Sequence, residues 1–200
     1  MSLSQSLERA KQFGIWLHER TNDRERPGGV RNRTAESIFQ QSLDISDGII
    51  VLLEHHLPGA AWALARPLFE SYVRGSWLLK FATDDQIEQF NNDRGPSMDQ
   101  LLRAIDNDPT TGGAWIHETE RKNRRSFNNL THGGSEHVSR RNTQDAVEPN
   151  YPESELEALV NFGIEVRILI GTELLSLMND EIGIQQLCNE AEALRRSFMP

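Results

Sequence analysis

The sequence predicts an all-α protein, an antiparallel helical bundle of four long helices with shorter helices between them. Two observations support this prediction. Apolar residues recur at spacings of three and four through most of the 200 residues, which is the period of an amphipathic helix. Glycine and proline pairs interrupt the pattern at intervals that suit the turns of a bundle.

Three helices are expected in the first part of the chain. The first covers about residues 3–17 and is followed by a loop at Pro27-Gly28-Gly29. The second begins near Thr34 as N-cap and ends near Leu57, where Pro58-Gly59 follows. The third covers about residues 60–82, and a proline inside a helix removes one backbone hydrogen bond. We therefore expect Pro67 to kink this helix near residue 63.

The second part of the chain alternates short and long helices. Residues 135–152 should be irregular, because Pro149 and Pro152 prevent a continuous helix. The helix at 153–178 is apolar almost all round, which is typical of a central helix. The other expected helices are a short one at 84–92, one that begins at a capping box in 97–100, one at 115–130 that ends near Gly133-Gly134, and a final one at 181–198.

Length and charge restrict the possible functions. We expect one domain, in which residues 1–30 form a helix and loop and residues 31–200 form the bundle. The net charge is −9, so bulk electrostatics would repel nucleic acid. Contact with RNA or a nucleotide therefore requires a local basic patch. Such a patch is available from Arg121, Lys122, Arg124, Arg125, Arg140 and Arg141.

No targeting or membrane segment is visible. The first residues lack a charged segment followed by an apolar one. No apolar run approaches the roughly 18 residues of a membrane span. We therefore predict a cytoplasmic protein without membrane contact. The single cysteine, Cys188, excludes an intramolecular disulfide, and its neighbours predict a buried helix position.

Arg66, Glu70 and Arg74 follow one another at intervals of four on the third helix and so form a line along it. The rest of this helix is largely apolar, which predicts partial burial of the line. Buried charges must be paired, and this trio could pair internally as a structural salt bridge. Alternatively, Arg66 and Arg74 could face a pocket and bind an anion such as phosphate or carboxylate.

Arg125 and His132 are the strongest candidates for chemistry. Seven positions are close to two helical turns, so both side chains should share one helix face with Asn128 and Asn129 between them. A permanently charged guanidinium beside a group that titrates near neutrality is suited to phosphodiesters. The alternative is that His132 simply ends the helix before Gly133-Gly134, where the helix dipole favours a cation.

Three short segments carry a family resemblance, namely Ala63-Leu-Ala-Arg-Pro-Leu-Phe-Glu70, Arg74-Gly-Ser-Trp-Leu78, and Leu130-Thr-His-Gly-Gly134 with Arg140-Arg141. They resemble the HEPN-like helical bundles (higher eukaryotes and prokaryotes nucleotide-binding), and among them bacterial families of unknown function. Active members of that superfamily have an arginine followed by a polar residue, and a histidine after four to six intervening positions. Six residues separate Arg125 from His132, which is the upper end of that range. Here Ser126 follows Arg125, where the superfamily more often has Asn, Asp or His.

The resemblance implies a homodimer in which two copies of the motif meet, and metal-independent cleavage of RNA of the toxin or phage-defence type. Catalytic roles would then fall to Arg125 and His132, with Asn128 or Asn129 orienting the phosphate or the imidazole. Arg66, Glu70, Arg74, Arg140 and Arg141 would form supporting anion-binding sites.

Two hypotheses follow. The first is a non-catalytic or weakly catalytic binding or scaffold module that acts through its dimer surface and an unidentified partner protein. The second is the ribonuclease. No cofactor is expected, and no metal either, because adjacent histidines such as His55-His56 cannot readily chelate one ion and no typical ligand spacing is present.

Overall fold

The computed structural model describes residues 2–22, 24–105 and 112–198. Apart from one isolated bridge between Asn142 and Val147, the regular structure in these ranges is helical. The all-α prediction is therefore confirmed. The helices are α1 (Leu3–Thr21), α2 (Val30–Glu54), α3 (Pro58–Ala63), α4 (Ala65–Lys80), α5 (Asp84–Asn91), α6 (Met98–Ile105), α7 (Gly113–Thr131), α8 (Ser135–Ser139), α9 (Glu153–Leu177) and α10 (Glu181–Phe198).

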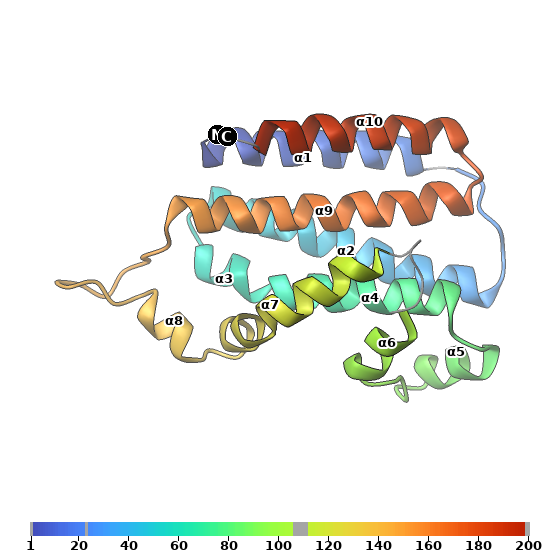
Figure 1. Cartoon of the computed structure of the whole chain (residues 1–200), viewed down its shortest axis with the longest axis horizontal. Helices are drawn as coiled ribbons and strands as arrows, with labels where there is room; N and C mark the ends of the chain where they lie inside the picture. Colours follow the sequence, from blue (N-terminus) through green and yellow to red (C-terminus); the bar gives the residue numbers. More distant parts are fainter. Residues whose placement is uncertain (1, 23, 106–111, 199–200) are drawn as a thin grey trace.

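The described part of the chain contains more long helices than the four that were predicted. Six of the described helices, namely α1, α2, α4, α7, α9 and α10, have at least sixteen residues. The N-terminal helix packs along α9 beside α10 (Figure 1), because Leu7, Phe13 and Leu17 are buried there. The region expected to be irregular begins with α8, and only the chain from Arg140 to Pro152 lacks a helix.

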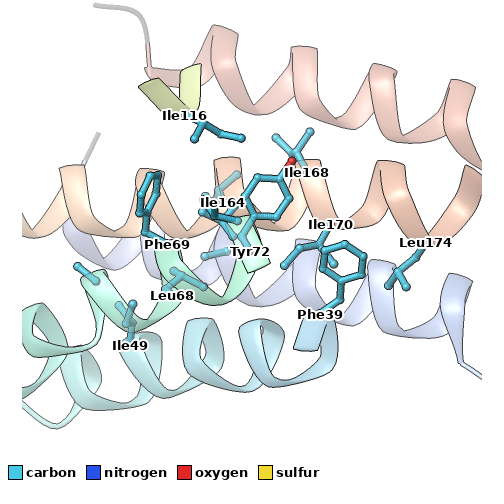
Figure 2. Packing of buried hydrophobic residues seen from close by; sticks show 14 of the residues in the cluster. Phe39, Ile49, Leu68, Phe69, Tyr72, Ile116, Ile164, Ile168, Ile170 and Leu174 are labelled. Atoms are coloured by element: carbon cyan, nitrogen blue, oxygen red, sulfur yellow. The ribbon is translucent and has the colours of Figure 1, made fainter. Parts of the chain in front are cut away.

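Helix α9 lies at the centre, as its apolar sequence predicts (Figure 1). Figure 2 shows Ile164 and Ile170 of α9 among Phe39 of α2 and Leu68 and Tyr72 of α4. All five side chains are buried. Although α9 is long and mostly apolar, no helix in the described ranges has the length and apolar character that a membrane span requires.

Two buried side chains of α9, Arg167 and Glu173, are charged and were missed in the sequence. Arg167 is only 1% exposed, and its guanidinium donates hydrogen bonds to Ser46 Oγ (2.7 Å), to the Ala10 carbonyl (3.1 Å) and to Asp47. Its burial lowers the pKa of Arg167, while Asp47 opposes this. A side chain at Gly14 would occupy the space of the guanidinium. Arg167 therefore ties α1, α2 and α9 together.

The break predicted near residue 63 is present and positions α7. Helix α3 ends at Ala63 and α4 begins at Ala65, because Pro67 cannot donate to the carbonyl four residues earlier. That carbonyl, on Ala63, instead accepts a hydrogen bond from Thr131 Oγ1 at 3.3 Å. The last residue of α7 is thus attached to the α3–α4 break.

Cys188 is exposed, so the prediction that it is buried was wrong. The apolar face of α10 is formed by Leu187, Ala191 and Leu194, which are buried. These positions follow the intervals of four and three of a helix face, and Cys188 lies about 100° away from Leu187.

Candidate functional site

Helix α7 crosses the bundle obliquely (Figure 1) and is attached to it by a narrow apolar face. Ile116, Phe127 and Leu130 are buried. The Phe127 ring lies 5.9 Å from that of Phe69 on α4 and 5.8 Å from that of Phe162 on α9. Because this face is fixed against two helices, the opposite side of α7 is turned to solvent.

Four polar residues form a line on that exposed side, namely Arg121, Arg125, Asn128 and His132, which we call the α7 polar face. All four are exposed. Their intervals of four, three and four keep them on one side of a helix. Within the described ranges, none of these four side chains makes a hydrogen bond or an ion pair. The expectation that Arg125, Asn128 and His132 share a face therefore agrees with their positions on α7.

Other cations of α7 are neutralised by neighbouring carboxylates. Lys122 pairs with Glu118 at 2.7 Å. Arg124 pairs with Asp99 of α6 at 2.8 Å and lies 3.3 Å from Glu120. Some cations of the predicted basic patch are therefore paired and others are not. Among the described residues of α7, the cations without an ion pair lie on the α7 polar face.

The turn after α7 fixes the position of His132. His132 is the C-cap residue, and Gly133 follows with a positive φ of 69°, which favours glycine. The Gly134 N–H donates to the Asn129 carbonyl at 2.7 Å, while Asn129 Nδ2 donates to the Arg125 carbonyl at 3.0 Å. The predicted helix end at Gly133-Gly134 is confirmed.

Ser126, the residue that departs from the superfamily pattern, is turned toward α8. Its hydroxyl donates to Glu136 Oε1 at 3.1 Å. His137 of the same short helix bonds to the Leu130 carbonyl near the end of α7. Ser126 therefore has a structural contact and attaches α8 to α7.

Arg140 and Arg141 lie beyond α8, at the start of the irregular segment. Arg140 forms an ion pair with Glu155 of α9 and its guanidinium carbon lies 5.7 Å from the centre of the Tyr151 ring. Arg141 is exposed. No contact between described residues joins either arginine to the α7 polar face.

The line on α4 is paired as its spacing predicts. Arg66 Nε donates to Glu70 Oε1 at 2.7 Å, and Arg74 Nη1 donates to Glu70 Oε2 at 3.0 Å. The three side chains are between 21% and 33% exposed, so the predicted partial burial is also present. Burial alone would raise the pKa of Glu70, but the hydrogen bonds from Arg66 and Arg74 outweigh it and lower that pKa.

Glu120 of α7 lies beside this line, and its pKa is shifted in the opposite direction to that of Glu70. Burial raises the pKa of Glu120; Arg124 and Arg66 oppose the shift, whereas Glu70 adds to it. The structure thus brings the α4 line next to a carboxylate that the sequence analysis did not single out. The signal available in the sequence was only its position, one residue before Arg121 in a basic helix.

These two carboxylates predict stability changes of opposite sign. Glu70 has a lowered pKa in the folded state, so its contribution is present above about pH 4.5 and is lost as the pH falls through the folded pKa. We expect Glu70→Gln to reduce the free energy of unfolding by about 1–2 kcal/mol at pH 7. This difference should shrink in urea titrations at progressively lower pH.

Glu120 should behave in the reverse way, because its pKa is raised on folding. Its protonated form is stabilising below about pH 4.5, and this contribution is lost as the pH rises through the folded pKa. Glu120→Gln is therefore expected to increase the free energy of unfolding at pH 7. Equal signs for the two variants in the same titrations would contradict both assignments.

The described ranges contain no group of three or more histidine, cysteine, aspartate or glutamate side chains placed to hold a metal ion. The fold and the site thus define an all-helical protein with an exposed, unpaired polar face on one helix. Residues 39–198 match the model of a family of unknown function, DUF6988, and the chain belongs to this family. The match includes α4, α7 and α9 completely.

Neither the curated proteins nor the solved structures include a match to this chain. The comparisons thus show the DUF6988 family and do not show membership of the HEPN-like superfamily.

Proposed function

We propose that this protein is a binding module of the HEPN-like type that binds the phosphate groups of RNA or a nucleotide on its α7 polar face, without efficient cleavage. One observation carries the proposal: Arg121 and Arg125 are exposed and unpaired among the described residues, on the same side of α7 as Asn128 and His132. Guanidinium groups bind phosphate through paired, charge-assisted hydrogen bonds.

The pairing of the remaining cations supports this choice of face. An anion at the α4 line would compete with Glu70, which already holds both arginines. An anion at Arg140 would compete with Glu155. The α7 polar face requires no such exchange, so we assign the α4 line and Arg140 only a supporting role, with exposed Arg141 as a secondary contact.

Charge also sets the expected strength of binding. The net charge of −9 opposes RNA at long range. Attraction must therefore come from a few short contacts, which are screened by salt. We expect weak binding at physiological ionic strength, with a homodimer or a partner protein adding contacts.

A metal-independent ribonuclease is the second candidate, and a specific observation favours it. Arg125 and His132 are both exposed at one end of α7 with Asn128 between them, so a second copy could complete the site. The neutral imidazole of one His132 would take the proton of the 2′-hydroxyl as that oxygen attacks phosphorus. The partner's His132 in its protonated form would donate a proton to the departing 5′-oxygen, while Arg125 would stabilise the phosphoryl charge.

Binding to single-stranded RNA tests the proposal. Arg125→Ala should weaken the affinity roughly tenfold, because it removes a charge-assisted contact. It should also reduce the slope of log affinity against log salt concentration by about 0.7. Fluorescence anisotropy with a labelled 12-nucleotide RNA at several salt concentrations measures both quantities.

Lys122→Ala is the matched control, because it removes one positive charge from the same helix but from a residue already paired with Glu118. Its affinity should stay within about twofold of wild type. Equal losses of RNA affinity for Lys122→Ala and Arg125→Ala would contradict phosphate binding at the α7 polar face.

Gel analysis of the same mixtures separates the two candidate functions. RNA cut by wild type but not by His132→Ala indicates the ribonuclease, and intact RNA indicates the binding module.

A further inference from the structure

A groove of about 830 Å³ lies between α6 and α7, next to the α7 polar face. Arg121 belongs to both, because it lines the groove and also begins the polar face. The groove walls include Leu102 and Arg103 from α6, and His117 and Glu120 from α7. A ligand held at Arg121 can therefore extend into the groove.

Glu120 is the least exposed of the three carboxylates that line the groove, the others being Asp99 and Glu118. Its side chain is 15% exposed and lies 3.3 Å from Arg124 Nε. The same guanidinium also pairs with Asp99, through Nη2 at 2.8 Å, so Glu120 shares Arg124 with a second carboxylate. Within the described ranges Glu120 accepts no side-chain hydrogen bond, whereas both oxygens of Glu70 do. A half-buried acceptor of this kind requires a donor, from water or from a ligand.

Arg103 and Arg121, in contrast to Glu120, are positively charged groups that face solvent. Both guanidinium groups are exposed, and neither has a partner among the described residues. The groove thus combines unpaired cations near solvent with a less exposed carboxylate and the apolar surface of Leu102. A simple anion would satisfy the arginines but would be repelled by Glu120. A basic peptide would satisfy Glu120 but would be repelled by the arginines.

A nucleotide satisfies both, because its phosphate is anionic and its base carries hydrogen-bond donors on a flat ring. We infer that the groove between α6 and α7 binds one base of the RNA strand whose phosphates lie on the α7 polar face, an inference that rests on the proposed function. Bases of single strands are read on their Watson–Crick edges. Glu120 accepts hydrogen bonds from that edge, and Arg103 and Arg121 contact the flanking phosphates.

The donor pattern selects among the bases. Guanine presents its ring N1–H and its exocyclic amine side by side, so it can donate to both oxygens of one carboxylate. Adenine and cytosine each offer an amine next to an acceptor, and uracil offers one N–H between two acceptors. An acceptor-only group such as ionised Glu120 therefore prefers guanine.

The preference is tested by anisotropy with two labelled eight-nucleotide RNAs, oligouridylate with one central guanosine and the same RNA with adenosine in its place. Wild type should bind the guanosine RNA about tenfold more tightly, a typical discrimination for a good bidentate contact. Glu120→Gln should lose this preference, because an amide has one acceptor and one donor where the carboxylate has two acceptors.

Glu118→Gln is the matched control. It changes the net charge by the same amount, on the same helix and in the same groove, but Glu118 is already paired with Lys122 and is 57% exposed. Its effect should be a similar gain in affinity for both RNAs, with the guanosine preference retained. If Glu120→Gln and Glu118→Gln behave alike, or if wild type shows no preference, the base site is overturned.

Titration of wild type and Glu120→Gln with guanosine 5′-monophosphate, followed by NMR, separates this inference from the proposed function. Shifts at α6 and α7 in wild type that Glu120→Gln abolishes would support the groove even if RNA failed to bind, and the proposed function would then be wrong. RNA binding that depends on Arg125 but shows no base preference would retain the proposed function and overturn the groove. The absence of both would overturn both.

Discussion

Gly14→Ala is expected to destabilise the protein by about 3 kcal/mol, although glycine to alanine within a helix normally stabilises by about 1 kcal/mol. Gly14 lies within α1, and a Cβ there would overlap the Nη1 group of Arg167. At a surface the end of an arginine could swing aside. Here the side chain is buried and bonded to Ser46, Ala10 and Asp47, so its displacement breaks these contacts.

Urea unfolding of Gly14→Ala and of a matched variant, Gly48→Ala, measures this effect. Gly48 is also within a helix, but a Cβ there would meet only Leu64 Cδ1 at 3.4 Å, an ordinary contact. Gly48→Ala should therefore be neutral or slightly stabilising. Adding Arg167→Met to Gly14→Ala should give less than the sum of the single effects, because both changes act on one contact. A Gly14→Ala protein as stable as wild type would show that the guanidinium is not fixed.

Phe127→Ala is expected to lower the free energy of unfolding by about 3–5 kcal/mol, the usual range for removing a buried aromatic ring. Phe127 is 5% exposed and is the residue through which α7 contacts rings on both α4 and α9. Loss of this ring leaves a cavity under α7, on the side of the helix opposite the α7 polar face. Local opening of α7 should therefore become more frequent than opening of α9.

Amide hydrogen exchange tests this distribution. Protection in α7 should fall in Phe127→Ala more than protection in α9, and urea unfolding should give the global loss. Val138→Ala provides the control, because Val138 is 59% exposed and its truncation should change stability by less than about 0.5 kcal/mol. Uniform loss of protection across all helices would contradict a specific role of Phe127 in attaching α7.

Much of the fold followed from the period of the apolar residues. The helix at α9 was predicted to be central because it is apolar almost all round, and it is. The break before α4 followed from Pro67, since a missing backbone N–H acts locally. The shared face of Arg125 and His132 and the pairing within the α4 line are likewise consequences of the helical repeat.

Features that depend on distant neighbours could not be predicted in the same way. Arg167 is the one basic residue of α9. Its burial depends on hydrogen bonds to Ser46, Ala10 and Asp47 from other helices and on the gap at Gly14. Cys188 directly follows the apolar Leu187 in sequence, but Leu187 belongs to the buried face of α10 and Cys188, one position on, does not.

The sequence by itself determined which residues form helices and which side chains share a helix face, because both depend on contacts within four positions along the chain. Only the tertiary structure decided which of the basic residues remain unpaired. Arg124 and Arg140 are neutralised by Asp99 and Glu155 from other helices, while Arg121 and Arg125 form no ion pair with a carboxylate among the described residues. Whether a charged side chain is neutralised depends on the groups within a few ångströms of it in space. The candidate site could therefore be identified only once the positions of α6, α7 and α9 relative to one another were known.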